Sequence, residues 1–117
     1  MIHLAEVYMD LAHAVATGNC AEVTFAATVN STPRFFMGSR THCMHEAFRV
    51  VTQSGPLEIV DNVALAPRVP VLPGDRIEVR GEYVPHSQHG PLVHWTHHDP
   101  THRHADGFIQ LHGQVYA

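Results

Sequence analysis

The sequence contains no lysine, and all seven of its basic residues are arginine. Because there are eleven acidic residues, the formal net charge at pH 7 is −4 with neutral histidine. Proteins that hold long nucleic acids neutralise many phosphates with a broad surface of basic side chains. The lack of lysine and the negative charge therefore exclude long duplex DNA as a partner, while single arginines can still bind a small anion.

Long apolar runs are also absent. None approaches the roughly 20 residues that are needed to span a bilayer, so no membrane partner is expected. The N-terminal stretch MIHLAEVYMDLAHAVATGNC has no basic start, and Glu6 and Asp10 interrupt its apolar part, which argues against a secretory signal. We therefore expect a cytoplasmic protein, and the composition is compatible with a homo-oligomer.

Only two cysteines are present, Cys20 and Cys43. Each precedes a predicted strand, and if those strands form a hairpin the cysteines lie at its opposite ends, roughly 25 Å apart at about 3.3 Å per residue. A disulfide needs Cα atoms within about 7 Å, so two free thiols and a reducing compartment are expected. The absence of any Cys-x-x-Cys pair excludes zinc ribbons and zinc deaminases.

What is present is a pattern of alternating side chains. Residues 1–18 place apolar side chains at helical spacing and predict a helix that ends at Gly18. Beyond it, apolar and polar residues alternate in five segments, which predict β-strands. These segments are 22–29, 45–53, 57–61, 75–84 and 107–116. Residues 30–43 are expected to form a loop, and 62–69 one short helical turn before Pro67 and Pro70 stop it.

The order of these segments predicts the fold class. A chain of 117 residues forms one domain, 1–117. Three strands in a meander, a short connector and two or three further strands have the order of a small five-stranded Greek-key barrel of the OB type. We therefore expect a mainly β protein, with an OB-like barrel over 22–117 and an N-terminal α-helix. The alternative is another partly open barrel or a sandwich with the helix at one end.

The densest polar motif is HWTHHDPTHRH, residues 94–104, in a chain with twelve histidines. Imidazole and carboxylate are the usual ligands of zinc and similar metals. The motif predicts a site for a divalent transition metal, most simply zinc, with His45 contributed by the second strand. The candidate metal ligands are His94, His97, Asp99, His104 and His45. Three protein ligands and a water form the open arrangement of metal hydrolases.

Several segments together resemble a known bacterial family. They are His45 to Phe48, Asn62, LAPRV at 65–69, GD at 74–75, GEY at 81–83, HWTHHDP at 94–100, His104, Gly107, Ile109, Gly113 and Tyr116. From about Phe25 onwards the chain resembles the family filed as domain of unknown function 3465. Asp61, Ala64 and Glu46 depart from that pattern, which usually has a histidine, an acid and a glutamine there. The resemblance supports the choice of site and implies no activity.

Other residues have two interpretations. Trp95 is either an anchor in the barrel or, with Tyr83, a platform for a base or ring. Arg68 or Arg49 could bind an anionic group. The remaining histidines of the turn-rich segments, His86, His89, His98 and His102, are most simply solvated. Cys43 lies close to two histidines in the sequence, but nothing there orients it as a nucleophile.

Three functions from different classes remain open. The first is a metal-dependent hydrolase of phosphodiesters or other small anionic substrates, with His97 or Asp99 accepting a proton and Arg68 stabilising the developing negative charge. The second is a non-catalytic OB-like module that binds a ligand or a short single-stranded nucleic acid. The third is a protein-binding module whose histidines form a structural metal site or sense pH.

Overall fold

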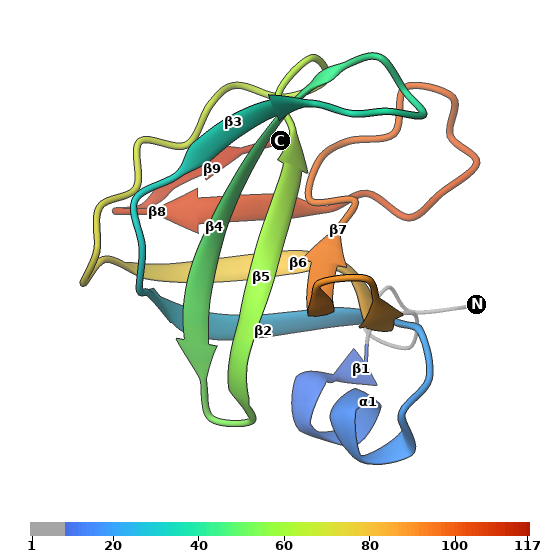
Figure 1. Ribbon diagram of the computed structural model, residues 1–117, viewed down its shortest axis with the longest axis vertical. Coiled ribbons are helices and arrows are strands. Elements are labelled where there is room, and N and C mark those ends of the chain that lie inside the picture. Colours follow the sequence, from blue (N-terminus) through green and yellow to red (C-terminus); the bar gives the residue numbers. More distant parts are fainter. Residues whose placement is uncertain (1–8) are drawn as a thin grey trace.

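A computed structural model describes residues 9–117 (Figure 1). All of its strands belong to one sheet of nine, so the protein is mainly β. In chain order the elements are β1 (Met9–Asp10), α1 (Leu11–Thr17), β2 (Ala21–Val29), β3 (Arg34–Met37), β4 (Met44–Thr52), β5 (Gly55–Asn62), β6 (Arg76–Ser87), β7 (Gly90–His94), β8 (Phe108–Leu111) and β9 (Gln114–Tyr116). Within the described residues, no helix is long and apolar enough to span a membrane.

The expected strand count of five is wrong, because β1, β3 and β7 were not predicted and the last predicted strand, 107–116, is divided into β8 and β9. β1 pairs with β2, β3 pairs with β4, and β8 and β9 continue the sheet beyond β6. The expected helix over 1–18 is also corrected. Met9 and Asp10 form a strand parallel to β2, so the helix begins only at Leu11. The part of that prediction that falls on residues 1–8 lies outside the described chain.

The longer strands are connected in a circuit. β2 pairs with β4, β4 with β5, β5 with β7, β7 with β6, and β6 again with β2. All of these pairs are antiparallel except β5–β7, which is parallel. In Figure 1 the strands of this circuit surround the middle of the molecule, and α1 lies below it. Buried side chains of these five strands form most of the core.

The core follows the predicted alternation. Along β2 and β6 the buried apolar side chains lie on one face of each strand, as in Val23, Ala27, Ile77 and Val79. Leu11 and Ala14 of α1 add to the same cluster, together with Val69 and Val71 of the connector after β5. Burial of an apolar side chain contributes about 1.5–3 kcal/mol. The core therefore fixes which face of each strand is left for polar side chains.

Two further predicted segments contain turns in the structure. The expected helical turn after β5 is present, since the Ala66 amide donates to the Asn62 carbonyl at 3.1 Å. The last predicted strand is instead the hairpin β8–β9, because His112 and Gly113 both have positive φ, of 50° and 80°. Such backbone angles are those of a two-residue hairpin turn. Both cysteines are free, as expected.

Gly107 closes the segment between β7 and β8, which is called the His-rich loop below (residues 95–107). Its amide donates to the His97 carbonyl at 2.9 Å. A Cβ at this position would lie 2.1 Å from the Trp95 carbonyl oxygen and 2.5 Å from that of Arg80. The loop can therefore lie against β6 only because this residue has no side chain.

Substitution of Gly107 tests this close approach. We expect Gly107→Ala to lower the free energy of unfolding by about 3 kcal/mol, because backbone must move to admit the methyl group. Gly90→Ala is the control, since a Cβ there meets nothing within 4 Å and only its φ of 88° is strained. That strain costs about 1 kcal/mol. Urea unfolding measures both; equal losses would contradict the packing argument.

Candidate metal centre and adjacent cavity

The His-rich loop is organised by Asp99, which is 2% exposed. Its Oδ1 accepts hydrogen bonds from the amide and hydroxyl of Thr101, and its Oδ2 accepts from the amides of Arg103 and His104. Burial alone would raise the pKa of Asp99, but these four bonds hold it well below its usual range. Both carboxylate oxygens are therefore occupied by the loop itself.

A cavity of about 460 Å³ lies where the β3–β4 turn meets the start of the His-rich loop. In Figure 1 both segments lie at the top of the molecule, the turn in green and the loop in orange. The cavity is lined by Arg40, Thr41, Cys43, His45, Val60, Asn62, Leu65, His94, Trp95 and His97. Three of the five predicted metal ligands thus share one wall, and Asp99 and His104 do not line it.

Two of these histidines are held in a fixed orientation. The Nδ1 of His45 lies 2.9 Å from the Cys43 carbonyl oxygen, and the Nδ1 of His97 lies 2.8 Å from that of His98. A carbonyl oxygen only accepts, so each Nδ1 carries a proton, and in the neutral form of either ring Nε2 keeps its lone pair. His45 also stacks on Phe36, with ring centroids 5.5 Å apart. Both rings therefore offer an acceptor for a ligand.

His97 is the more buried of the two, at 4% exposed. Burial lowers its pKa below the ordinary value of 6.5, and the nearby His104 and His45 lower it further. The bond to the His98 carbonyl and the charge of Asp99 oppose this shift without reversing it. His97 is therefore a neutral imidazole at pH 7 and can act as a base or a metal ligand.

A second cluster lies beside the cavity. Glu22, Glu82 and His104 each offer a ligand atom, and these atoms all lie within 4.8 Å of one another. His104 Nε2 is 3.1 Å from Glu22 Oε1 and 3.9 Å from Glu82 Oε2. His94 joins them, because its Nε2 is 2.6 Å from Glu82 Oε1. Two predicted ligands, His94 and His104, thus meet two glutamates that sequence reasoning missed.

The charges of this cluster do not balance without a cation. Glu22 and Glu82 lie directly opposite each other on β2 and β6, a position in which like charges are destabilising. His104 Nδ1 is 2.8 Å from the Ala105 carbonyl and carries the proton, so in neutral His104 the unprotonated Nε2 faces a carboxylate. Burial, and then the charge of Glu82, raises the pKa of Glu22 against the opposing effect of His104. A metal ion or an extra proton would resolve this.

Trp95 connects the cavity and the cluster. Its indole stacks on His104, with centroids 4.1 Å apart and planes inclined by 13°, and is tilted against His97 at 5.1 Å. Its φ of 55° turns the chain sharply at the end of β7. Trp95 therefore packs against two histidines and also lines the cavity.

The other predicted residues lie elsewhere. The guanidinium of Arg68 lies 4.5 Å from the ring centroid of Phe35, and Tyr83 is a core residue at 4% exposed. Arg49 lies opposite Glu58 in the β4–β5 pair. None of the three lines the cavity, where the arginine is Arg40.

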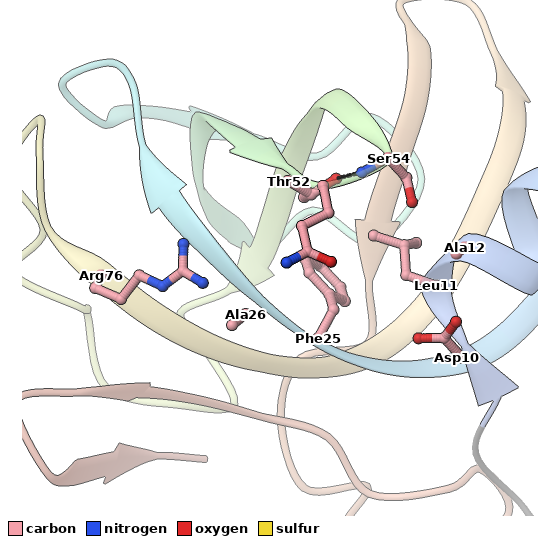
Figure 2. A pocket seen from close by; sticks show the side chains of 9 residues that line it. Asp10, Leu11, Ala12, Phe25, Ala26, Thr52, Ser54 and Arg76 are labelled. Carbon is pink, nitrogen blue, oxygen red and sulfur yellow. Dashed lines mark hydrogen bonds between the residues drawn. The ribbon is translucent and has the colours of Figure 1, made fainter.

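A smaller hollow of about 220 Å³ lies beside α1 (Figure 2). Phe25 stands in its middle, with Arg76 on one side and Asp10 on the other. Its lining includes neither a histidine nor any of the predicted site residues. The Arg76 guanidinium already donates to the Thr28 hydroxyl at 3.2 Å. The residues that carry chemistry are therefore gathered at the other end of the molecule.

Comparison with known proteins identifies the family. No curated protein matches the chain. A family model matches residues 31–117, about three quarters of the sequence, starting later than the resemblance suggested. All the residues that line the larger cavity lie within this range, whereas Glu22 lies outside it. The chain belongs to the family described as "Protein of unknown function (DUF3465)".

Proposed function

We propose that the circuit of β2, β4, β5, β7 and β6 is a closed barrel of the OB type. Two features support this. One is the neighbour order along the circuit, and the other is its single parallel pair, which joins β5 and β7, the third and fifth of these strands in chain order. A five-stranded Greek-key barrel has this arrangement. The remaining short strands are then additions at its edges, and the cavity lies on the outer face of β4 and β5 beside the end of β7.

We propose that the protein binds a divalent transition metal, with zinc as the first candidate. The observation that carries this proposal is the group Glu22, Glu82 and His104, whose ligand atoms converge within 4.8 Å from three separate segments. His94 contacts Glu82 through its Nε2, 2.6 Å from Oε1, and would hold that carboxylate in place. Nitrogen and oxygen donors of this kind suit zinc and its neighbours.

The chemistry that fits this centre is hydrolysis of a small anionic substrate. A bound metal would supply a Lewis acid and a water that ionises near neutral pH. The adjacent cavity would hold the substrate, and Arg40 at its wall would bind the anionic group, the part that the sequence assigned to Arg68. Neutral His97 would accept the proton. Asp99 would act indirectly, by holding His104 in place through the loop.

A non-catalytic ligand-binding module is the second candidate. It is favoured by Val60, Leu65 and Trp95, which give the cavity a largely apolar wall. Such walls are typical of sites that bind without reacting as well as of active sites.

We also infer a reducing, cytoplasmic location, which the two free thiols support.

Metal content tests the proposal. Protein purified without a histidine tag is expected to hold about one equivalent of metal, and zinc at 100 times its dissociation constant to stabilise it by about 2.7 kcal/mol. Glu82→Gln should weaken zinc binding by at least about 100-fold. Elemental analysis and thermal unfolding with added zinc measure these effects.

The matched control is Glu78→Gln. Glu78 lies on the same strand, four residues away on the same face, and is exposed. Its substitution should leave zinc affinity unchanged. The competing explanation of the cluster is a protonated His104 paired with Glu22. Less than about a tenth of an equivalent of metal, with no stabilisation by zinc, would favour that ion pair and overturn the metal proposal.

A further inference from the structure

The larger cavity carries a charge opposite to that of the whole protein. Its lining includes Arg40 and three histidines but no aspartate or glutamate, although the chain has a net charge of −4. An acidic protein that gathers only basic and neutral groups around one hollow favours an anion there. The ligand is therefore expected to be negatively charged.

The size of the cavity and the side chains of its wall indicate which kind of anion fits. At about 460 Å³ the cavity is within the range of sites for small organic molecules, roughly 300–1,000 Å³, and far exceeds a phosphate ion. Flat rings and branched apolar side chains form much of its wall, among them Trp95, Val60 and Leu65. An anion with a ring-shaped body thus fits better than a bare anion or a flexible polar chain.

The polar atoms of the wall indicate which kind of ring. The Oδ1 of Asn62 accepts the Ala64 amide at 3.0 Å, which leaves the side-chain amide of Asn62 as a donor. His45 and His97 keep Nε2 as acceptors because Nδ1 is bonded to backbone in both. A wall with a fixed amide donor and fixed acceptors matches a heterocycle whose edge carries both kinds of group, as nucleobases do.

We propose that this cavity binds a nucleoside monophosphate. Asn62, His45 and His97 hydrogen-bond the edge of the base, the apolar wall covers its ring, and Arg40 and Thr41 bind the phosphate. This inference extends the proposed function by naming the class of ligand. Only hydrolysis of that ligand rests on the proposed function; binding of the ligand does not. Binding itself involves no metal, since Glu22, Glu82 and His104 do not line the cavity.

Trp95 provides the measurement, because it is the only tryptophan and lines the cavity. Full-length protein freed of metal with a chelator is titrated with the 5′-monophosphates of adenosine, guanosine, cytidine and uridine, while tryptophan fluorescence is followed. At least one should give a saturable change. Its parent nucleoside and inorganic phosphate should each bind at least about 10-fold more weakly, because each lacks one half of the contacts.

Two substitutions separate the halves of the ligand. Arg40→Gln should weaken binding of the monophosphate by at least about 10-fold and leave the affinity for the parent nucleoside unchanged. Asn62→Asp keeps the acceptor for Ala64 but replaces the amide donor, and should weaken binding of both. Arg103→Gln is the control, since Arg103 is exposed on the His-rich loop and does not line the cavity.

The outcomes separate this inference from the metal proposal. Glu82→Gln should bind the monophosphate like the wild type even if it has lost zinc. A nucleotide response in a protein that binds no metal therefore supports the inference alone. No fluorescence change with any of the four monophosphates, phosphate that binds as tightly as they do, or Arg40→Gln that binds like the wild type would each overturn it.

Discussion

Replacement of Asp61 by asparagine is expected to stabilise the protein by about 4 kcal/mol at pH 8. Asp61 is completely buried, and its Oδ1 accepts the Thr96 hydroxyl at 2.8 Å. Its Oδ2 has no hydrogen-bond partner, and neither has Oε2 of the buried Glu46, which lies directly opposite in the β4–β5 pair. An asparagine keeps the acceptor for Thr96 and brings an amide where an unpartnered oxygen now lies.

The pH dependence of this effect follows from the pKa of Asp61. Burial, and then the charge of Glu46, raises it from 3.8 to about 7. Between these two values the folded protein holds a proton that the unfolded chain has lost, so stability falls as the pH rises. At about 1.36 kcal/mol per pH unit, ionisation of this residue costs about 4 kcal/mol above pH 7. Below pH 4 both forms of the chain are protonated, and the cost disappears.

Urea unfolding at pH 4, 6 and 8 measures this. Asp61→Asn should match the wild type at pH 4 and exceed it increasingly towards pH 8. Asp10→Asn is the control, because Asp10 is exposed at the end of β1 and its substitution should change stability by less than about 0.5 kcal/mol. An asparagine variant that is less stable than the wild type at pH 8 would mean that the folded protein favours the carboxylate.

The strands that the sequence predicts well are those with one buried face. β2 and β6 alternate because their apolar side chains enter the core and their polar ones do not, and a period of two is visible in any such strand. β3 is different. It is four residues long and pairs only with β4, so its burial follows no alternation and Pro33 and Gly38 on either side suggest a loop. Pairing with β4 decided its structure, and no pattern within these four residues reveals that pairing.

The candidate site also combines residues that a local sequence pattern points to with residues that no local pattern points to. A dense run of histidines is a local feature, and two of its members, His94 and His104, both contact Glu82. Glu22 and Glu82 were missed because each occupies an ordinary polar position of an alternating strand. Only the register of β2 against β6 places them side by side. Registers depend on the whole set of strand pairings, which no single segment of sequence specifies.

Asp99 shows a related limit. In the sequence it is one more metal-ligand type among histidines, whereas in the structure the loop supplies four donors to it. An Asp followed by Pro is also a common turn signal, so the structural role had a visible cue. Arg40 had none, because only the folding of the β3–β4 turn over β5 brings it to the cavity.

Replacement of His97 is expected to abolish hydrolysis without loss of metal. If the protein hydrolyses small anionic substrates, His97→Gln should lower the rate by about 100-fold to 10,000-fold, the usual contribution of a general base. His97 is suited to this part because its Nδ1 is held by the His98 carbonyl and its Nε2 alone remains to take a proton. It is not a member of the Glu22, Glu82 and His104 group, so zinc content should stay unchanged.

The pH profile distinguishes a base from a residue that only shapes the cavity. Burial lowers the pKa of His97 below 6.5, so the neutral form persists into mildly acidic solution. The rate should therefore remain high at pH 6.5 and fall only at lower pH, as the imidazole takes up a proton. His97→Gln keeps much of the side-chain volume but cannot titrate, so this acidic limb should be absent from its residual rate.

The assay uses nucleotides, cyclic dinucleotides and short oligonucleotides, each with zinc, manganese or magnesium. His97→Ala is measured beside His97→Gln to separate lost chemistry from altered packing, and His86→Ala is the matched control because His86 is exposed on β6. The control should retain the full rate. Equal rates in wild type and both His97 variants would remove His97 from the mechanism. If the wild type hydrolyses none of these compounds with any of the metals, the ligand-binding module becomes the better account, because the cavity and its fixed imidazoles need no reaction to hold an anion.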